Sequence, residues 1–175
     1  MLLGINLSHD SSVAICDSVG NLIFAVAEER FSRYKNHWGI PLQSLNSLDS
    51  SLKESIQEVV IGSDSQLSKF TAERLLIGTQ TNPSIKPGVK LQQNYPSGRI
   101  KVDDPKIDVQ NMIARILGLQ SISFSWVKHH ESHIGCAAGA FNRNRDGLLI
   151  SLDGSGDGES GAISVFNNMN RQIYN

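Results

Sequence analysis

Residues 122–140 read ISFSWVKHHESHIGCAAGA, and the interpretation of the whole chain depends on this stretch. Its first part, Ile122–Val127, is a strand-like run, and the small residues after the histidines predict a helix that begins near His130. In such a helix His129 and His133 lie about one turn apart on one face, so both imidazoles can reach one ion. Imidazole suits zinc, iron, copper and nickel, which suggests a transition-metal site. In isolation the pair is more simply explained as histidines that bond to the backbone.

The composition bounds the class of protein. The chain has 175 residues, of which 39% are hydrophobic and 19% charged, as in an ordinary globular domain. A formal net charge of -1 gives no electrostatic reason to expect nucleic acid or a membrane as a partner. The N-terminus lacks the basic segment of a signal peptide, and Cys16 and Cys136 show no CxxC spacing. We therefore expect a cytoplasmic protein with two buried free thiols.

Alternating turns and apolar runs predict an α/β fold. Three short strands separated by polar turns form an antiparallel meander at the N-terminus, and helices and strands alternate after it. A strand that follows a helix indicates a parallel crossover. This order describes a mixed sheet covered by helices. The predicted strands cover residues 2–7, 13–16, 22–27, 58–62, 122–127, 148–152, 162–166 and 171–174, and the predicted helices cover residues 42–56, 67–77, 107–119 and 130–141.

The end of the chain repeats the pattern of its beginning. Residues 2–24 place two strands around a polar turn and add a third strand, and residues 148–174 have the same order. We therefore predict a duplicated fold whose second copy has only begun. The first lobe would cover residues 1–145, and the truncated start of the second lobe would cover residues 146–175.

The two Ser/Gly-rich turns of this repeat, residues 8–12 and 153–161, are candidate phosphate-binding elements. Small residues let backbone N–H groups approach an anion. Each turn by itself is more simply explained as a plain hairpin turn. The occurrence of the same pattern twice favours a pair of turns that together bind phosphate. The charged segment from Glu28 to Lys35 is either an anchor for phosphate or acceptor, or a solvated loop. The candidate cofactor-binding residues from these segments are Asp10, Ser11, Ser12, Gly154, Ser155, Gly156 and Arg30.

Four motifs occur in order: GINLSHDSS at residues 4–12, EERFSRYK at 28–35, HHESH at 129–133 and LDG at 152–154. Together they resemble the N-terminal region of the O-carbamoyltransferase family of nodulation-factor and antibiotic biosynthesis. That family is related to the tRNA threonylcarbamoyl-transferring enzymes and, more distantly, to the actin/hexokinase/Hsp70 superfold. The resemblance therefore implies an RNase H-like, actin-like lobe. It runs from Met1 to about Phe166, and residues 63–106 contribute little to it.

The resemblance also implies a function. The family's first domain binds carbamoyl-adenylate, which a separate C-terminal domain makes from carbamoyl phosphate and ATP. It transfers the carbamoyl group to a hydroxyl of a small-molecule acceptor. The resemblance makes His129 and His133 ligands of a divalent metal, with Asp153 as a third. Iron is the typical metal, and zinc and manganese are alternatives. The metal would act as a Lewis acid and template.

His9 is the general base that the resemblance implies, and imidazole suits that task. A further acidic ligand and the adenosine pocket would lie beyond Asn175. We therefore expect an incomplete site, and a fragment that is inactive alone.

Other classes of function are weighed against this one. An actin-like ATPase or sugar kinase stays open, although its first turn would carry Asp-x-Gly where this chain has His9-Asp10-Ser11. A non-catalytic nucleotide- or metal-binding scaffold module also stays open. A zinc protease is excluded because Ile134 stands where HExxH requires histidine. A nuclease is disfavoured because it needs clustered carboxylates. Homodimerisation is left open.

Overall fold

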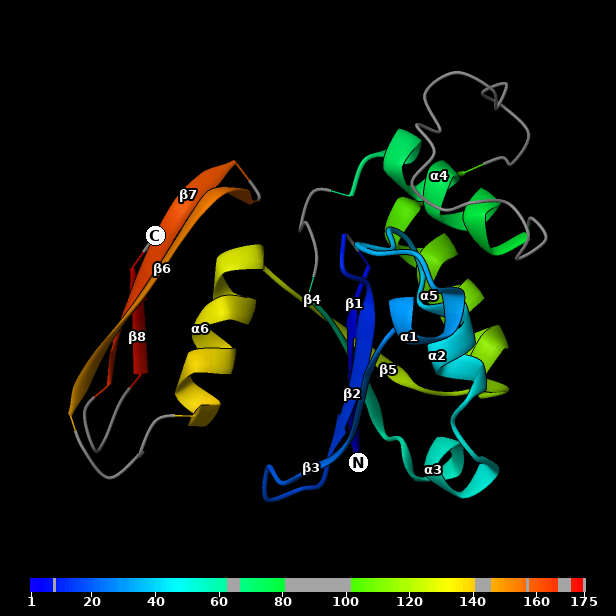
Figure 1. Ribbon diagram of the computed structural model, residues 1–175, viewed down its shortest axis with the longest axis horizontal. Coiled ribbons are helices and arrows are strands. Elements are labelled where there is room, and N and C mark those ends of the chain that lie inside the picture. The colour runs from blue at the N-terminus through cyan, green and yellow to red at the C-terminus, as the bar shows by residue number, and fades with distance from the viewer. Residues whose placement is uncertain are drawn as a thin grey trace. The chain divides into compact units, whose positions relative to one another are not determined.

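The computed structural model describes residues 1–7, 9–62, 67–80, 102–140, 146–156, 158–166 and 171–174 (Figure 1). The chain divides into two compact units, and each is described by itself. The first unit contains Met1–Ile61 and Leu67–Ser125, and the second contains Gly62–Gln66 and Trp126–Asn175. Within the described ranges, no helix combines the length and the apolar character needed to cross a membrane.

The first unit is built on a five-stranded mixed sheet with the order β3-β2-β1-β4-β5. β1 (Leu2–Asn6), β2 (Ser12–Cys16) and β3 (Leu22–Ala27) form the predicted antiparallel meander. β4 (Glu58–Gly62) pairs in parallel with β1, which confirms the predicted crossover. β5 (Ser123–Val127) forms the other edge, where the Ser123 hydroxyl donates to the carbonyl oxygen of Gln57.

The core of this unit follows from two sequence periods. Every second residue of β1 and β4 is buried, including Leu3 and Val59, because successive side chains of a strand point to opposite faces. Helix α5 (Pro105–Leu117) buries Val109, Ile113 and Leu117, which are spaced by one helical turn. It ends at Gly118, as the sequence predicts, but it begins two residues before the predicted start at Ile107. The Asp104 side chain accepts hydrogen bonds from the first turn, and Gly118 ends the helix at φ 73°.

The helical region after β3 differs from the prediction. The single amphipathic helix expected over residues 42–56 is wrong, because two short helices occupy that range. Asp49 separates them: its backbone is extended, and its side chain accepts a hydrogen bond from the backbone N–H of Leu52. An aspartate in this position caps a new helix. The other helices of the first unit are α1 (Glu29–Ser32), α2 (Leu42–Asn46), α3 (Ser50–Ser55) and α4 (Lys69–Gln80).

The second unit places one helix on a three-stranded antiparallel sheet with the order β6-β7-β8 (Figure 1). This meander has the strand order of the N-terminal one, as the sequence repeat predicts. The predicted end of its helix at Phe141 lies outside the described residues. The elements of the unit are α6 (His129–Ala140), β6 (Gly147–Gly156), β7 (Glu159–Phe166) and β8 (Arg171–Tyr174). The expectation of two buried thiols is wrong, because Cys136 on α6 is exposed and Cys16 on β2 is half-buried.

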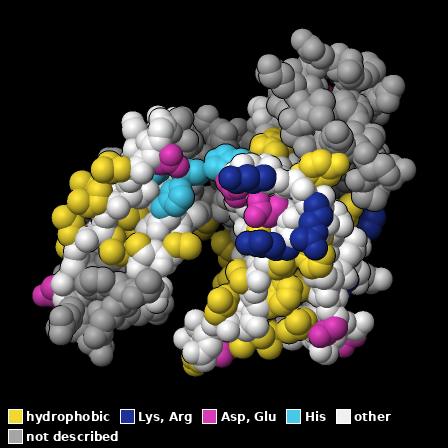
Figure 2. Space-filling view, in the orientation of Figure 1, with side chains coloured by type: hydrophobic (Ala, Val, Ile, Leu, Met, Phe, Trp, Pro, Cys, Tyr) yellow, Lys and Arg dark blue, Asp and Glu magenta, His cyan; other side chains and the backbone are white. Residues whose placement is uncertain are grey.

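The two faces of the β6–β7 hairpin differ in burial. On one face, Leu149 and Ala162 pack with Ile134 and Ala138 of α6 in an apolar cluster. The other face exposes large apolar side chains, which form part of the yellow surface in Figure 2. These exposed residues are Leu148, Ile150, Leu152, Ile163 and Val165.

The predicted glycine-rich turn at residues 153–161 is wrong in extent. β6 continues to Gly156 and β7 begins at Glu159, so most of the segment is strand. Leu152 pairs with Gly161, and Gly156 pairs with Glu159. Residues 153–155 therefore stand opposite a single residue of β7, which makes an irregularity of the β-bulge kind in β6. Bulges bend a strand and change the direction of a side chain.

A mixed sheet flanked by helices confirms the predicted α/β class. The narrower RNase H-like, actin-like assignment stays a prediction. The division into a first lobe at residues 1–145 and the start of a second lobe at 146–175 also stays a prediction.

Candidate metal centre

The first turn of α6 is held by contacts of its own polar residues. The backbone N–H of Lys128 lies 3.4 Å from Oε2 of Glu131, and the Ser132 N–H donates to the Lys128 carbonyl oxygen at 3.0 Å. The first contact satisfies a backbone N–H that a helix start leaves unpaired, and the second is the first hydrogen bond inside the helix. The helix begins at His129, one residue before the expected start. His129 and His133 therefore lie one turn apart on the same helix face.

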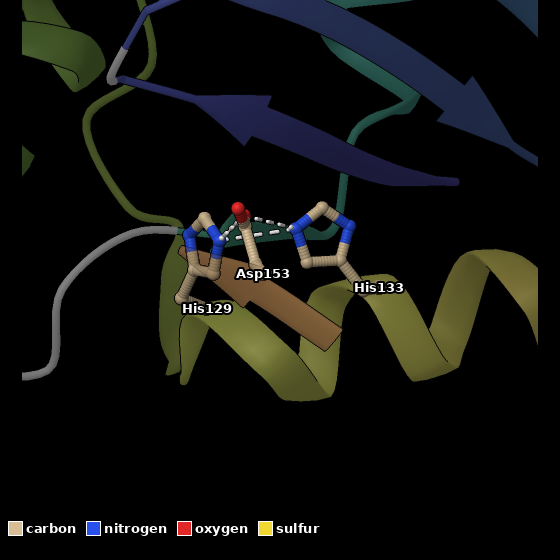
Figure 3. A group of neighbouring side chains, drawn as sticks. All are labelled: His129, His133 and Asp153. Carbon is tan, nitrogen blue, oxygen red and sulfur yellow. Dashed lines mark hydrogen bonds and ion pairs between the residues drawn. The ribbon is translucent and has the colours of Figure 1, made fainter. Parts of the chain in front are cut away.

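The predicted ligands His129, His133 and Asp153 converge on one point (Figure 3). The two histidines project from α6, and Asp153 projects from the irregular part of β6. Nε2 of His129 lies 2.9 Å from Oδ2 of Asp153 and 3.0 Å from Nε2 of His133. Nε2 of His133 lies 3.5 Å from the same carboxylate oxygen.

These distances fit a divalent transition ion. With metal–ligand bonds of about 2.0–2.2 Å, two ligand atoms lie about 2.9 Å apart at an octahedral angle and about 3.4 Å apart at a tetrahedral angle. The three distances of 2.9, 3.0 and 3.5 Å match this range. A carboxylate oxygen can only accept, and each neutral imidazole offers one acceptor nitrogen. A single cation could therefore satisfy all three atoms, whereas one shared proton could not.

The Asp153 carboxylate is prepared for such a role. Its other oxygen, Oδ1, accepts a hydrogen bond of 2.6 Å from the backbone N–H of Gly154. The hydrogen bond from His129, followed by that from Gly154, lowers the pKa of Asp153 to about 2. The carboxylate is thus ionised at every pH at which the protein would function, which is the state that a metal requires.

The centre is partly open to solvent. The side chains of His129, Asp153 and His133 are 21%, 42% and 51% exposed. Two histidines and one carboxylate on one side of an ion leave other coordination positions for further ligands. Such open sets occur in catalytic metal sites, whereas structural zinc sites are closed by four protein ligands.

His130 was missed by the sequence analysis, and it does not belong to the ligand cluster. Its side chain is buried at 1% exposure, with Nδ1 2.9 Å from the Ser151 hydroxyl and Nε2 3.1 Å from the Glu159 carbonyl oxygen. Both ring nitrogens thus have protein partners. The motif held one signal of this difference: adjacent residues point to different faces of a helix.

The predicted base, His9, lies in the first unit, just after β1. Its Nδ1 lies 2.8 Å from Oδ2 of Asp10, and because a carboxylate can only accept, Nδ1 donates. Asp10 has a φ of 59° and also accepts a hydrogen bond of 2.6 Å from Asn36. The hydrogen bond from His9, followed by that from Asn36, lowers the pKa of Asp10. The pair forms a His–Asp arrangement in which Nε2 can act as a base.

The other candidate residues have varied settings. Ser11 is buried, and Ser12 is half-buried within β2. Gly154, Ser155 and Gly156 lie in β6 and not in a turn. Their expected anion-binding loop is thus replaced by strand, and the Gly154 N–H is already bonded to Asp153.

Arg30 lies on α1 and is exposed, and Figure 2 shows Lys and Arg side chains in dark blue on this part of the first unit. Glu28 differs from its basic neighbours. It is buried at 1% exposure, and its carboxylate accepts from the backbone N–H groups of Gln43 and Ser44 and from the Ser44 hydroxyl. Glu28 therefore holds the start of α2, and the segment from Glu28 to Lys35 is not simply a charged loop.

The comparison with known protein families finds no matching family, and the comparison with curated proteins finds no matching relative.

Proposed function

We propose that this chain is the metal-binding N-terminal part of an O-carbamoyltransferase, which moves a carbamoyl group from carbamoyl-adenylate to a hydroxyl of a small molecule. The observation that carries the proposal is the convergence of His129, His133 and Asp153 on one point. The choice of carbamoyl transfer rests on the order of the four sequence motifs that resemble this family.

The proposed reaction is an acyl-type transfer. The acceptor oxygen forms a bond to the carbamoyl carbon, and the bond from that carbon to the phosphate oxygen breaks. AMP leaves with the bonding electron pair. His129, His133 and Asp153 would hold a divalent ion, with iron(II) preferred to zinc or manganese, and the ion would supply Lewis acidity for the transfer.

His9 is the proposed base for the hydroxyl proton. Its hydrogen bond to Asp10 supports this role, because donation from Nδ1 fixes the tautomer in which Nε2 carries the lone pair. The adenylate phosphate is assigned to Asp10, Ser11 and Ser12 with Arg30, whose guanidinium supplies the positive charge. The backbone N–H of Ser11 already donates to the carbonyl oxygen of His37. We do not assign the intermediate to Gly154, Ser155 and Gly156, because they lie in a strand and the Gly154 N–H is bonded to Asp153.

The metal is tested first, on the 175-residue chain. Elemental analysis after anaerobic loading with Fe²⁺ should give one ion per chain, and His133→Ala should reduce this content strongly. Glu54→Gln, which changes an exposed carboxylate on α3, is the matched control and should keep the ion. Equal metal content in wild type and His133→Ala would contradict the proposal.

Transfer is tested with carbamoyl phosphate, ATP and a panel of hydroxylated acceptors, on the chain together with the C-terminal domain that the proposal implies. The expected result is AMP release that depends on the acceptor and falls at least 100-fold in His9→Ala, within the range for loss of a general base. Hydrolysis of ATP or phosphorylation of acceptor without carbamoyl phosphate would instead indicate an ATPase or kinase. Metal and nucleotide binding with no transfer would indicate a scaffold module.

A further inference from the structure

His130 is a polar side chain buried inside the second unit, and in the sequence it lies between the two candidate ligands His129 and His133. It is 1% exposed, whereas His133, one turn away, is 51% exposed at its side chain. A buried polar group is retained at a cost unless its hydrogen bonds are made. The partners of His130 therefore indicate what it does.

The two ring nitrogens of His130 bond to two different strands. Nε2 lies 3.1 Å from the carbonyl oxygen of Glu159 in β7, and because a carbonyl can only accept, Nε2 donates. In the neutral ring Nδ1 then accepts the hydroxyl hydrogen of Ser151 in β6, at 2.9 Å. One imidazole thus joins the first turn of α6 to both strands of the hairpin.

We propose that His130 is the positioning residue of the metal centre, because its bonds to Ser151 and Glu159 fix α6 against the hairpin so that the ligands of the two elements meet. The inference rests on the proposed metal site. His130 lies in the helical turn that carries both His129 and His133, and Ser151 lies two residues before Asp153 in β6. The Ser151 contact therefore holds β6 directly before its irregular part, in which Asp153 lies.

Among the described residues, the other contacts between α6 and the hairpin fix their relative position less closely. Ile134 and Ala138 pack against Leu149 and Ala162, which are all apolar. The long, partly exposed side chain of Lys128 also reaches Oε1 of Glu159, with its Nζ at 2.9 Å. Burial of apolar surface is non-directional and tolerates small shifts of one element along another. A fully satisfied polar pair inside a core, in contrast, specifies one arrangement. The apolar cluster therefore holds α6 on the hairpin, and the hydrogen bonds of His130 fix where α6 lies along it.

The test compares metal affinity among variants that leave all three ligands in place. The probes are Zn²⁺, measured by competition with a chelator, and Co²⁺, whose visible spectrum reports ligand geometry. His130→Leu keeps a side chain of similar size and removes both hydrogen bonds. His130→Gln offers one donor and one acceptor with a spacing close to that of the ring nitrogens. Ser151→Ala removes only the hydroxyl.

His130→Leu and Ser151→Ala should weaken Zn²⁺ binding about 10- to 100-fold, the range found when groups that orient ligands are removed. Both should also alter the Co²⁺ spectrum. His130→Gln should recover part of the affinity. The control is Ser164→Ala, which removes a buried hydroxyl from the same face of the sheet, at a position that pairs with Leu149, and should leave the affinity and the spectrum unchanged.

The outcomes separate the two proposals. If the wild-type chain binds neither ion, the metal centre itself is wrong and the role of His130 falls with it. If wild type binds and the His130 and Ser151 variants bind equally well with an unchanged Co²⁺ spectrum, only the positioning role is overturned. If His130→Leu fails to fold, Ser151→Ala and His130→Gln decide the question.

Discussion

Nε2 of His129 and Oδ2 of Asp153 lie 2.9 Å apart, although 24 positions separate the two residues in the chain. His129 opens a helix, and Asp153 lies in the irregular part of a strand that packs on that helix. The extra residues of β6 release Asp153 from regular strand pairing, and such irregularities are found beside active sites. The contact therefore joins a helix start and a strand bulge into one candidate ligand set.

Asp153→Asn should remove the stabilisation that metal gives to the protein. Ligand binding raises the free energy of unfolding by about 2.7 kcal/mol when the ligand is at 100 times its dissociation constant. Addition of Zn²⁺ should therefore raise the melting temperature of wild type and leave that of Asp153→Asn almost unchanged, because a neutral amide is a poor ligand. Differential scanning fluorimetry with and without a chelator measures both. Glu54→Gln should respond like wild type, and an undiminished shift in Asp153→Asn would exclude its carboxylate as a ligand.

The metal-free protein should show the effect of Asp153 at low pH. The pKa of this carboxyl is lowered from 3.8 to about 2, with the hydrogen bond from His129 as the first cause. A lowered pKa contributes stability that is present above the usual value and is lost as pH falls from about 4 towards 2. Carbon-detected NMR should place the Asp153 midpoint near 2 in wild type and higher in His129→Ala. Identical midpoints in the two proteins would show that His129 does not hold the carboxylate.

Much of the fold could be predicted because its signals are local. Short apolar runs predicted β1 and β4, and Gly118 marked the end of α5. The cap at Asp104 was missed, so α5 begins two residues before the predicted start. The prediction of one helix over residues 42–56 was wrong for a local reason too. The apolar spacing continues across Asp49, but the cap at Asp49 starts a second helix. Periodicity reports the buried face and does not report where the backbone turns.

The ligands of the candidate site could be predicted, but the residues that hold those ligands in place could not. The spacing of His129 and His133 follows from helix geometry, and Asp153 came from the resemblance. The pairing of His130 with Ser151 and Glu159 depends on how α6 lies on the hairpin, which no local pattern encodes. The bulge could not be predicted for the same reason. A glycine-rich segment is typical of a turn, and only its register with β7 shows that it is strand.

Gly161→Ala should destabilise the second unit. A Cβ atom at this position would lie 2.6 Å from the carbonyl oxygen of Ser151, so one backbone must move. Overpacking of this kind costs about 1–3 kcal/mol, measured as the loss in the free energy of unfolding by urea denaturation. Gly154→Ala is the matched control, because no atom lies within 4 Å of its added Cβ. Equal stability of the two variants would show that β7 does not approach Ser151 as closely as described.

Glu28→Gln should destabilise the first unit without any effect on metal. The buried carboxylate accepts from the Gln43 and Ser44 N–H groups at 2.9 and 2.8 Å and from the Ser44 hydroxyl at 2.7 Å. An amide turns one of its two acceptor atoms into a donor that faces these donors, and loss of hydrogen bonds to a buried charge costs about 1.5–3 kcal/mol. Urea denaturation should show this loss in Glu28→Gln and almost none in the exposed control Glu54→Gln. Zn²⁺ affinity equal to that of wild type should accompany it, because all three ligands lie in the other unit. A stability equal to that of Glu54→Gln would mean that Glu28 is a surface charge, as the loop interpretation of its segment had it.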